Sequence, residues 1–554
     1  MTAFHIATLR TPNGRRAFGL AAMAASALLL SADGATQTRS SIHPYLQVEQ
    51  VLTADFNTGD VLTYTGVGGG VTAEVSTRRV QATIAYDYQH RISWNDRLKD
   101  NDVHTGLAAV HVEAVPGVLT FDAGALAARG HNDIRRPVPG LRTIDSPNTA
   151  EIYSVYAGPT LSTHAGPVAV NAAYRLGYVY VDDHSVAGGP VTGAPRVETY
   201  HSSTVQQANA SVGMAPGELP FGWTVAAGWG REDSDRLDAN FQGKYVRGDV
   251  VLPVSPTLAV TGGAGWESMS SSQQDFLRDA NGNPVFSAGG NLVGDPARPR
   301  LLTYDESGLI WDVGVIWRPS PRTELQVRGG QRYGGTTVFG TLQHRLNEDY
   351  VLTASVYDSV SSFGRLLMAD LSGVSPNFRV PKGGIGGIGG FGSGGCVFGS
   401  DPKKPGGTAC FDDALQSIDN FNFRSRGATL GISGGRGPWS FGLGATYANR
   451  RYFAPPGPEF VLHGVTDQSV SLNGTVGRRF TRTSGIDFDA YAAWYDSGIQ
   501  GANGSYSTGV SANYYRTIWR DHVQANVAAG VYNTHSGNFD STIGSILFGL
   551  RYTF

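Results

Sequence analysis

Long apolar runs are absent from most of this sequence. Beyond the first forty of its 554 residues there is no stretch of about 20 apolar residues, which a membrane-spanning helix requires. Charged residues make up only 16%, the formal net charge is -3, and no run of Lys and Arg is interleaved with aromatic residues. These absences exclude a helical membrane protein and give no indication of a nucleic-acid partner.

Catalytic and cofactor motifs are also absent. The sequence has no G-x-S-x-G elbow, no H-E-x-x-H helix and no P-loop, and its 13 histidines are scattered. Residues 384–389 formally match G-x-G-x-x-G, the motif of dinucleotide-binding sites. No strand is expected before them and no helix after them, so we interpret them as a low-complexity segment. Residues 279–283 (DANGN) are interpreted as a turn, with a calcium site as the alternative. We therefore expect that the protein binds no cofactor and no metal and that it is not an enzyme. In the alternative that it is an enzyme, a Ser, a His and an acidic residue would have to lie together on neighbouring strands.

Cysteine is nearly absent, with only Cys396 and Cys410, fourteen positions apart in a Gly-rich stretch. In an oxidising compartment such a pair is predicted to form a disulfide, which in the chain-entropy model contributes roughly 3 kcal/mol. A metal pair is the weaker alternative because no His or third Cys accompanies the two. The segment 373–413 is predicted to be either a plug or lid or a flexible surface loop.

The N-terminus is typical of an export signal. Arg15 and Arg16 precede the apolar core 17–30, which is too short to span a bilayer comfortably. We interpret residues 1–35 as a cleaved secretory signal peptide; the alternative is a twin-arginine signal, although that route carries folded cargo. The remainder, 36–554, is predicted to be one domain.

Period-two alternation recurs almost to the end of the chain. It is found at 324–328, 486–494 and 523–531, and it predicts strands with one apolar face and one polar face. In the segment from Val80 to Tyr88 the apolar set is Val80, Ala82, Ile84, Tyr86 and Tyr88, and the polar set is Gln81, Thr83 and Asp87. A soluble β-sandwich alternates as well, so further features are needed to distinguish it from a transmembrane barrel.

The end of the chain is one such feature. The last residues alternate with an apolar, partly aromatic face and then stop, which resembles the terminal signal that the outer-membrane barrel assembly machinery recognises. The residues of this C-terminal assembly signal are Phe548, Leu550, Tyr552 and Phe554.

Connections that alternate between tight and long are the second feature. The segments Val115–Val118, Pro253–Pro256 and Arg436–Pro438 are tight, whereas about 268–307 and 358–423 are long. Short periplasmic turns and long external loops give this rhythm in bacterial barrels. Tyr and Trp near strand ends are typical of interfacial girdles.

Together these features predict an all-β fold, a closed antiparallel transmembrane β-barrel of about 18–22 strands with long external loops. The first strand is expected near Tyr45, both termini on the periplasmic side, and two strands, 45–56 and 336–346, are marginal. The expected location is the outer membrane of a Gram-negative bacterium, and the expected state is a monomer. The candidate lumen-lining residues are Asp87, Asp312, Glu324, Arg328, Asp487, Asp489 and Arg551.

One turn adds a resemblance to a known family. Its residues are Trp317, Arg318, Pro319, Ser320, Pro321, Arg322 and Thr323. With the segments 331–334, 342–345 and 356–358 that follow, the turn resembles the outer-membrane β-barrel family associated with the PEP-CTERM and exosortase system. The resemblance covers about 308–359, with looser similarity in 476–496. Members of that family tend to lie near exopolysaccharide genes, so the resemblance implies a compartment and a pathway.

Two functions follow as hypotheses. The first is a channel or conduit for polysaccharide, because a lumen lined by polar side chains offers hydroxyl-rich chains weak, repeated hydrogen bonds. The second is a non-conducting structural or surface-anchoring barrel whose external loops bind polymer or protein. A nutrient receptor is not favoured, because strands begin by Tyr45 and leave no room for an N-terminal plug domain. The expected partners are outer-membrane lipid, the assembly machinery, and polysaccharide or export components.

Overall fold

The computed structural model describes residues 39–94, 100–131, 149–183, 200–287, 291–378, 396–397, 409–411, 418, 420–457, 460–519, 522–537 and 539–554. Apart from Arg39, these residues belong to one compact unit, Ser40–Phe554. The predicted signal peptide, 1–35, lies outside the described residues.

Long strands make up this unit, as the alternation of apolar and polar side chains predicts. The first twelve are β1 (Arg39–Asp55), β2 (Val61–Ser76), β3 (Val80–Ser93), β4 (Asn101–Val115), β5 (Leu119–His131), β6 (Thr149–Ala165), β7 (Val168–Asp183), β8 (Ser202–Met214), β9 (Gly222–Ser234), β10 (Asn240–Ser255), β11 (Leu258–Gln273) and β12 (Leu301–Ser320). The others are β13 (Thr323–Arg332), β14 (Gly335–Arg345), β15 (Tyr350–Ser361), β16 (Cys396–Val397), β17 (Ala409–Cys410), β18 (Asn422–Arg436), β19 (Trp439–Phe453), β20 (Thr466–Arg479), β21 (Ser484–Asp496), β22 (Ser505–Trp519), β23 (Val523–Ser536) and β24 (Phe539–Thr553). Two helices are described, η1 (Arg236–Asp238) and α2 (Phe363–Ser372).

Among the described residues, twenty-two strands form one closed ring, and β16 pairs only with β17. Consecutive strands of the ring are neighbours, β15 pairs with β18, and β24 returns to pair with β1 in antiparallel register from Tyr45↔Thr553 to Asp55↔Ile543. Closure leaves no sheet edge with unpaired N–H and C=O groups. The predicted closed antiparallel barrel is confirmed at the upper end of its strand range, and both marginal strands are present, as β1 and β14.

The connections differ in length between the two ends of the ring. At one end, here called the short-turn end, they are 77–79, 116–118, 166–167, 215–221, 256–257, 321–322, 346–349, 437–438, 480–483 and 520–522. At the opposite long-loop end they include 132–148, 184–201, 274–300, 362–421 and 454–465. The predicted alternation is confirmed, but the strands are longer than expected. β10 runs through Pro253 to Ser255, and the long loops shrink to 274–300 and 362–421.

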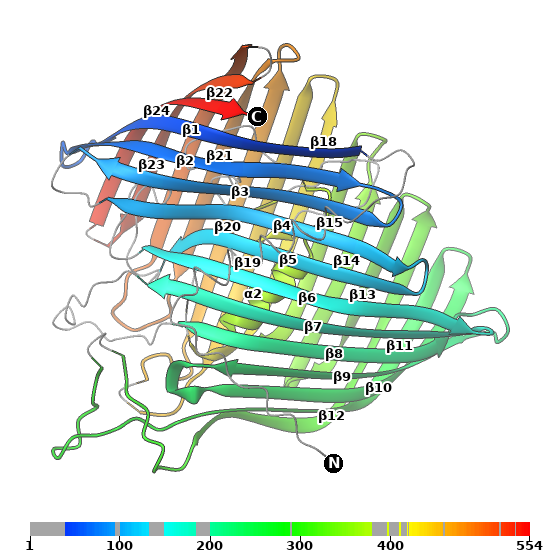
Figure 1. Cartoon of the computed structure of the whole chain (residues 1–554). Helices are drawn as coiled ribbons and strands as arrows, with labels where there is room; N and C mark the ends of the chain where they lie inside the picture. Colours follow the sequence, from blue (N-terminus) through cyan, green and yellow to red (C-terminus); the bar gives the residue numbers. More distant parts are fainter. Residues whose placement is uncertain are drawn as a thin grey trace, which may run out of the picture. The chain divides into compact units, whose positions relative to one another are not determined.

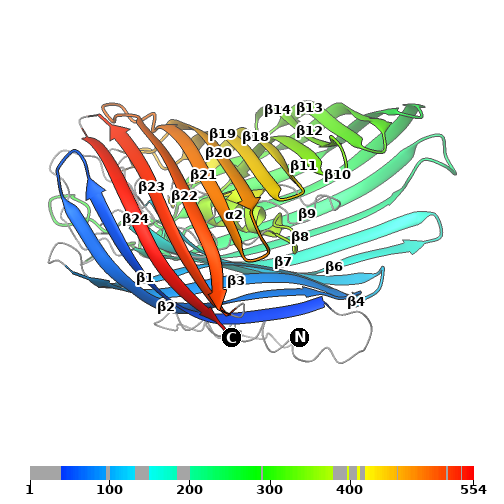
Figure 2. The same ribbon diagram turned by 90° about the horizontal axis from the view of Figure 1, so that it is seen from above.

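One helix lies inside the ring. Figure 1 shows β1 to β9 in front and β13 to β23 behind them, with α2 between the two walls, and Figure 2 shows the same arrangement from above. Helix α2 belongs to the 362–421 connection, which leaves the wall at Ser361 and rejoins it at Asn422. Among the described residues, no helix is long and apolar enough to cross a membrane.

Candidate functional site in the interior of the strand ring

Helix α2 is docked on the inner surface of β5 to β8. Its Ser362 N-cap accepts a hydrogen bond from the Arg365 backbone N–H, which satisfies one of the free donors at the helix start. Its side chains Leu367 and Leu371 are fully buried, and Phe363 and Met368 are only 1% exposed. Full burial of such a side chain contributes about 1.5–3 kcal/mol, so the helix is held mainly by apolar contact.

The wall beneath α2 is apolar on its inward face. Leu126, Ile152, Val179, Val181 and Val205, which come from four neighbouring strands, are all 0% exposed and lie in the same cluster as the helix side chains. In an aqueous pore the inward positions of these strands would be polar. This patch is therefore explained by the helix that covers it.

Two glycines permit the close approach of α2 to the wall. A Cβ at Gly364 would lie 2.5 Å from the Tyr200 hydroxyl and 2.6 Å from Glu232 Oε1. A Cβ at Gly177 in β7 would lie 2.4 Å from the Met368 sulfur. Both positions favour glycine, because a Cβ there would force neighbouring side chains of the helix or the wall to shift.

The N-terminus of α2 points toward a buried carboxylate. Ser362 donates a hydrogen bond to Glu232, which is 4% exposed, and a negative charge at a helix N-terminus is favourable. One turn later, Arg365 lies 4.0 Å from the centroid of the Phe241 ring on β10, and burial lowers the pKa of this guanidinium. Polar and aromatic contacts therefore fix the helix at its start.

The segment after α2 continues toward the short-turn end. The Thr83 hydroxyl donates to the Pro376 carbonyl at 2.7 Å, and the Asn377 side-chain amide donates to Gln81 Oε1 at 3.2 Å. Gln81 is the second residue of β3, directly after the 77–79 turn. The chain therefore crosses most of the height of the ring between Ser361 and Asn377.

The return of the segment is anchored at the long-loop end. The Tyr200 backbone N–H donates to the Ile418 carbonyl at 3.2 Å, and the Ser234 hydroxyl donates to Asn420 Oδ1 at 2.8 Å. Phe411 and Ile418 are 0% exposed and belong to the same apolar cluster as α2. We call the described residues of the connection 362–421 the internal plug; they are 362–378, 396–397, 409–411, 418 and 420–421.

Part of the predicted 373–413 segment belongs to this plug. Cys396 and Cys410 are register partners in the β16–β17 pair, but their side chains lie outside the described residues, so the disulfide stays a prediction. The glycine run 384–389 also lies outside the described residues. The described residues Val374 and Phe378 are 6% and 4% exposed inside the ring, and the choice between plug and loop for the whole segment stays a prediction.

Inward and outward side chains alternate through the rest of the ring. In β24, Ile546, Phe548 and Leu550 are 43%, 58% and 50% exposed, while Ser545 and Leu547, which flank Ile546, are 3% and 0% exposed. Large apolar side chains are exposed in the same manner at Val246, Val250, Leu309, Val313, Phe488 and Val527. The surface that faces away from the plug is therefore apolar.

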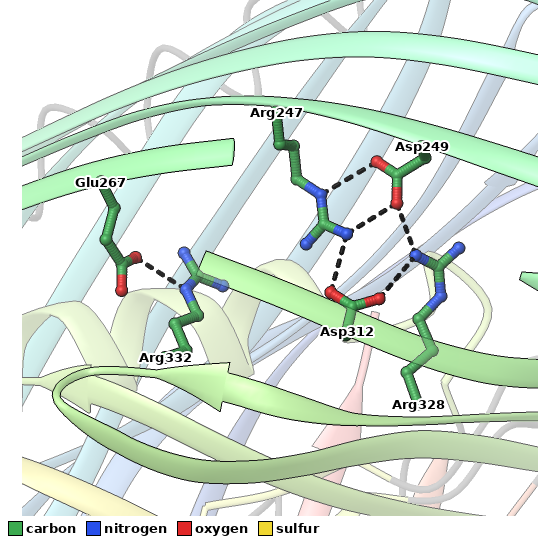
Figure 3. Close-up of polar contacts among 6 residues, drawn as sticks. All are labelled: Arg247, Asp249, Glu267, Asp312, Arg328 and Arg332. Carbon is green, nitrogen blue, oxygen red and sulfur yellow. Dashed lines mark hydrogen bonds and ion pairs between the residues drawn. The ribbon is translucent and has the colours of Figure 1, made fainter. Parts of the chain in front are cut away.

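Two of the candidate lumen residues meet in a charged cluster on β10, β12 and β13, shown in Figure 3. Arg247 Nη2 lies 2.6 Å from Asp249 Oδ1 and 2.7 Å from Asp312 Oδ2. Arg328 Nη1 lies 2.6 Å from Asp249 Oδ1 and 3.3 Å from Asp312 Oδ1. We call these four residues the tetrad. Its two positive and two negative charges balance, and the Asp312 side chain is only 5% exposed.

A glycine on the intervening strand makes room for the tetrad. Gly263 of β11 is the register partner of both Asp249 and Asp312. A Cβ at this position would lie 2.3 Å from Arg247 Nη2 and 2.4 Å from Asp249 Oδ1. Because Gly263 has no side chain, the charged side chains of β10 can reach across β11 and pair with those of β12 and β13. A separate ion pair, Arg332 Nε to Glu267 Oε2 at 2.7 Å, lies beside the tetrad in Figure 3.

Two other candidates meet where the ring closes. Gln47 Nε2 donates to Asp87 Oδ2 at 2.8 Å, and Arg551 Nη2 donates to Gln47 Oε1 at 3.0 Å. Tyr45 donates to Asp87 Oδ2 at 2.9 Å across β2, where a Cβ at Gly70 would lie 2.2 Å from the Tyr45 hydroxyl. Asp87 and Arg551 thus join β3 to β24 through side chains of β1.

The remaining candidates lie apart from these two clusters. Glu324 accepts from Arg318 Nη2 at 2.9 Å close to the short-turn end, with its side chain 40% exposed. Asp487 and Asp489 occupy alternate positions of β21 and therefore share a face. The Asp279 carboxylate accepts from the Asn283 backbone N–H at 2.8 Å, which lowers the pKa of Asp279 and supports the plain turn.

The sequence predictions missed a second buried ion pair. Arg450 of β19 makes a bidentate contact with Asp467 of β20 at 3.1 and 2.9 Å, and both side chains are almost inaccessible. Tyr452 donates to the same carboxylate at 2.8 Å. The sequence did contain a signal for Asp467, because it alternates with Ser469 and Ser471 on one polar face of β20. That Arg450 is its partner becomes apparent only from the register of β19 against β20.

Comparison with known proteins gives matches among solved structures alone. No family model and no curated protein matches this chain. The FrpB iron transporter from Neisseria meningitidis is similar at 12% identity and a TM-score of 0.40, over 92% of this chain and 82% of that chain. The siderophore receptor PiuA from Acinetobacter baumannii is similar at 8% identity and a TM-score of 0.42, over 92% and 82%. The copper transporter OprC is similar at 11% identity and a TM-score of 0.42, over 94% and 82%.

Proposed function

We propose that this chain is an integral β-barrel of a Gram-negative outer membrane, and that it acts as a plugged conduit for a polar, hydroxyl-rich polymer. The observation that carries the membrane placement is the apolar outward face of the closed ring. Side chains such as Leu309 and Phe548, 67% and 58% exposed, would be unfavourable in water over so large a surface, whereas lipid accommodates them.

The polar interior supports the conduit. Away from the α2 patch many inward positions are carboxylates, guanidiniums, amides and hydroxyls, as at Asp312, Arg328 and Asn526. Most of the inward charges are already paired, so a passing polymer would meet hydrogen-bonding groups without a strong net field. Polysaccharide is proposed as the cargo because of the resemblance at 308–359 to barrels found near exopolysaccharide genes.

The plug favours a second candidate, a non-conducting anchoring barrel. Because α2 is held by apolar burial and crosses the interior, the resting barrel is expected to conduct weakly. If the plug never leaves the wall, the long-loop end alone would act, as a surface that binds polymer or protein.

Single-channel recording with a plug deletion tests the proposal. Ser361 and Phe423 are register partners, so a short Gly-Asn turn can replace 362–421 without changing the strand pairing. The matched control replaces 274–300, because Gln273 and Leu301 are also partners and the replacement leaves α2 and the strands β5 to β8 that it contacts unchanged in sequence. We expect the plug deletion to give large, steady conductance, and the intact and control proteins to give small, intermittent conductance that added oligosaccharide reduces.

Three outcomes contradict parts of the proposal. An intact barrel that stays silent while the plug deletion conducts favours the anchoring barrel over the conduit. Equal conductance in all three proteins removes the role of the plug. Failure of all three to insert into lipid vesicles overturns the membrane placement itself.

A further inference from the structure

Unpaired arginines gather at the short-turn end between β19 and β22. Arg478 and Arg479 end β20, Arg482 lies in the 480–483 turn, and Arg516 lies near the end of β22. Within the part of the chain that the structure describes, none of the four is within ion-pair distance of a carboxylate. The arginines of the interior are different, because Arg328 and others like it lie against acids.

Strand register places two of these arginines on the outward face. Arg478 is the register partner of Trp439 on β19 and of Ile486 on β21, and Ile486 is the partner of Tyr514 on β22. Opposite residues of antiparallel strands share a face, and Trp439 and Tyr514 are 47% and 38% exposed on the apolar surface. Arg516 lies two positions beyond Tyr514 and therefore points to the same side.

Aromatic rings surround the Arg478 guanidinium. It lies 4.8 Å from the centroid of the Trp439 ring and 5.5 Å from that of Phe480, and the Phe480 and Tyr514 rings are 6.5 Å apart. Trp and Tyr at strand ends mark the depth of lipid headgroups, where a guanidinium can stay hydrated while its stem contacts acyl chains. At that depth the group that matches a guanidinium is a phosphate, which it binds with two parallel hydrogen bonds.

We propose that Arg478 and Arg516, with Trp439, Phe480 and Tyr514, form a binding site for anionic phospholipid headgroups on the outward face of the barrel at its short-turn end. The proposal rests on the membrane placement proposed above and adds the lipid partner. Arg479 and Arg482 in the same hairpin raise the local positive potential, although the whole chain has a net charge of -3. The patch therefore complements an anionic headgroup by charge and by its position on the apolar surface.

Lipid selectivity of the reconstituted full-length barrel tests the site. Spin-labelled phosphatidylglycerol and phosphatidylcholine report how strongly each lipid is retained beside the protein. We expect the intact barrel to prefer phosphatidylglycerol, by about fivefold for each arginine near the surface, and to lose the preference in high salt. The R478Q/R516Q variant is expected to retain both lipids almost equally.

The matched control is R78Q/R79Q, which removes the same charge from the 77–79 turn at the same end of the ring. Insertion of each variant is scored separately by heat-modifiable gel mobility in phosphatidylcholine vesicles, and failure of the intact barrel to insert would count against the proposed function. Normal insertion with no lipid preference, or an equal loss in the control, overturns the lipid site.

A loss of dextran sulfate binding in R478Q/R516Q with lipid preference unchanged assigns the arginines to an acidic polymer, and the lipid site is then wrong.

Discussion

At the scale of residues, charge inside the ring is neutralised by pairing within it. The four tetrad side chains are between 5% and 20% exposed, so each charge has lost most of its hydration. Removal of one member of such a cluster leaves an uncompensated buried charge. The free-energy cost of that charge is larger than the net stabilisation that the intact cluster provides. The tetrad is therefore sensitive to single substitutions and tolerant of balanced pairs.

Asp312→Asn is expected to destabilise the barrel by about 3–5 kcal/mol, the usual cost of breaking a buried ion pair. The residue keeps its shape but no longer neutralises Arg247 and Arg328. Urea unfolding of the protein in lipid vesicles, followed by tryptophan fluorescence, measures the change. The double variant D312N/R328Q restores the charge balance and should recover most of the loss.

Glu324→Gln is the matched control for this prediction. Its partner Arg318 is 59% exposed and Glu324 is 40% exposed, so the pair is a surface ion pair worth about 0–1 kcal/mol. If D312N and E324Q unfold at the same urea concentration, the tetrad has no special role in stability.

At the scale of elements, strands were easier to predict than the plug. The alternation around Val80 to Tyr88 and in the final strand was visible because each strand has one apolar and one polar face. Helix α2 was not predicted, because a ten-residue helix within a long connection has too few turns for a reliable period. The apolar inward positions of β5 to β8, such as Ile152 and Val181, were the available signal, since strands that are apolar on both faces are covered on both sides.

Gly364→Val tests whether α2 depends on contact with the wall. The new side chain would overlap the Tyr200 hydroxyl and Glu232, and overpacking of this kind costs about 1–3 kcal/mol. We expect α2 to open from the wall more often while the ring stays intact, so amide hydrogen exchange in 363–372 should accelerate about tenfold or more.

Gly373→Ala is the control for Gly364→Val, because its Cβ would lie 3.3 Å or more from the nearest atoms at the end of the same helix. Faster exchange in the strands of the G364V ring would mean that the substitution unfolds the barrel. Unchanged exchange in the helix would mean that α2 is not held by this contact.

At the scale of the whole molecule, closure depends on residues far apart in the sequence. β24 pairs with β1, and Asp87, Gln47 and Arg551 join three strands at the seam. The alternation predicted that Asp87 and Arg551 lie on the polar face. It could not predict their connection, because that connection depends on the register of β1 against β24 and on the missing side chain at Gly70. Composition and alternation thus predict the barrel, and contacts across strands require the folded chain.

The aromatic side chain of Phe554 is expected to act in assembly and not in stability. Phe554 is 62% exposed on the outward face, and its contribution to the seam is a backbone hydrogen bond to the Pro44 carbonyl at 3.0 Å, which any residue can make. Phe554→Ala should therefore fold into detergent micelles as well as the unchanged protein. With the assembly machinery present, in cells, it should accumulate outside the membrane if Phe554 belongs to the recognised signal.

Phe488→Ala provides the comparison, because Phe488 is also outward and 47% exposed but lies in β21, away from the terminus. It removes a similar lipid contact and should assemble in cells like the unchanged protein. Equal assembly defects in F554A and F488A would trace the effect to lost lipid contact, and a defect of F554A in micelles would show that Phe554 stabilises the seam. Normal assembly of F554A in cells would remove the terminal residue from the recognition signal and leave Phe548, Leu550 and Tyr552 of the same face to be tested in turn.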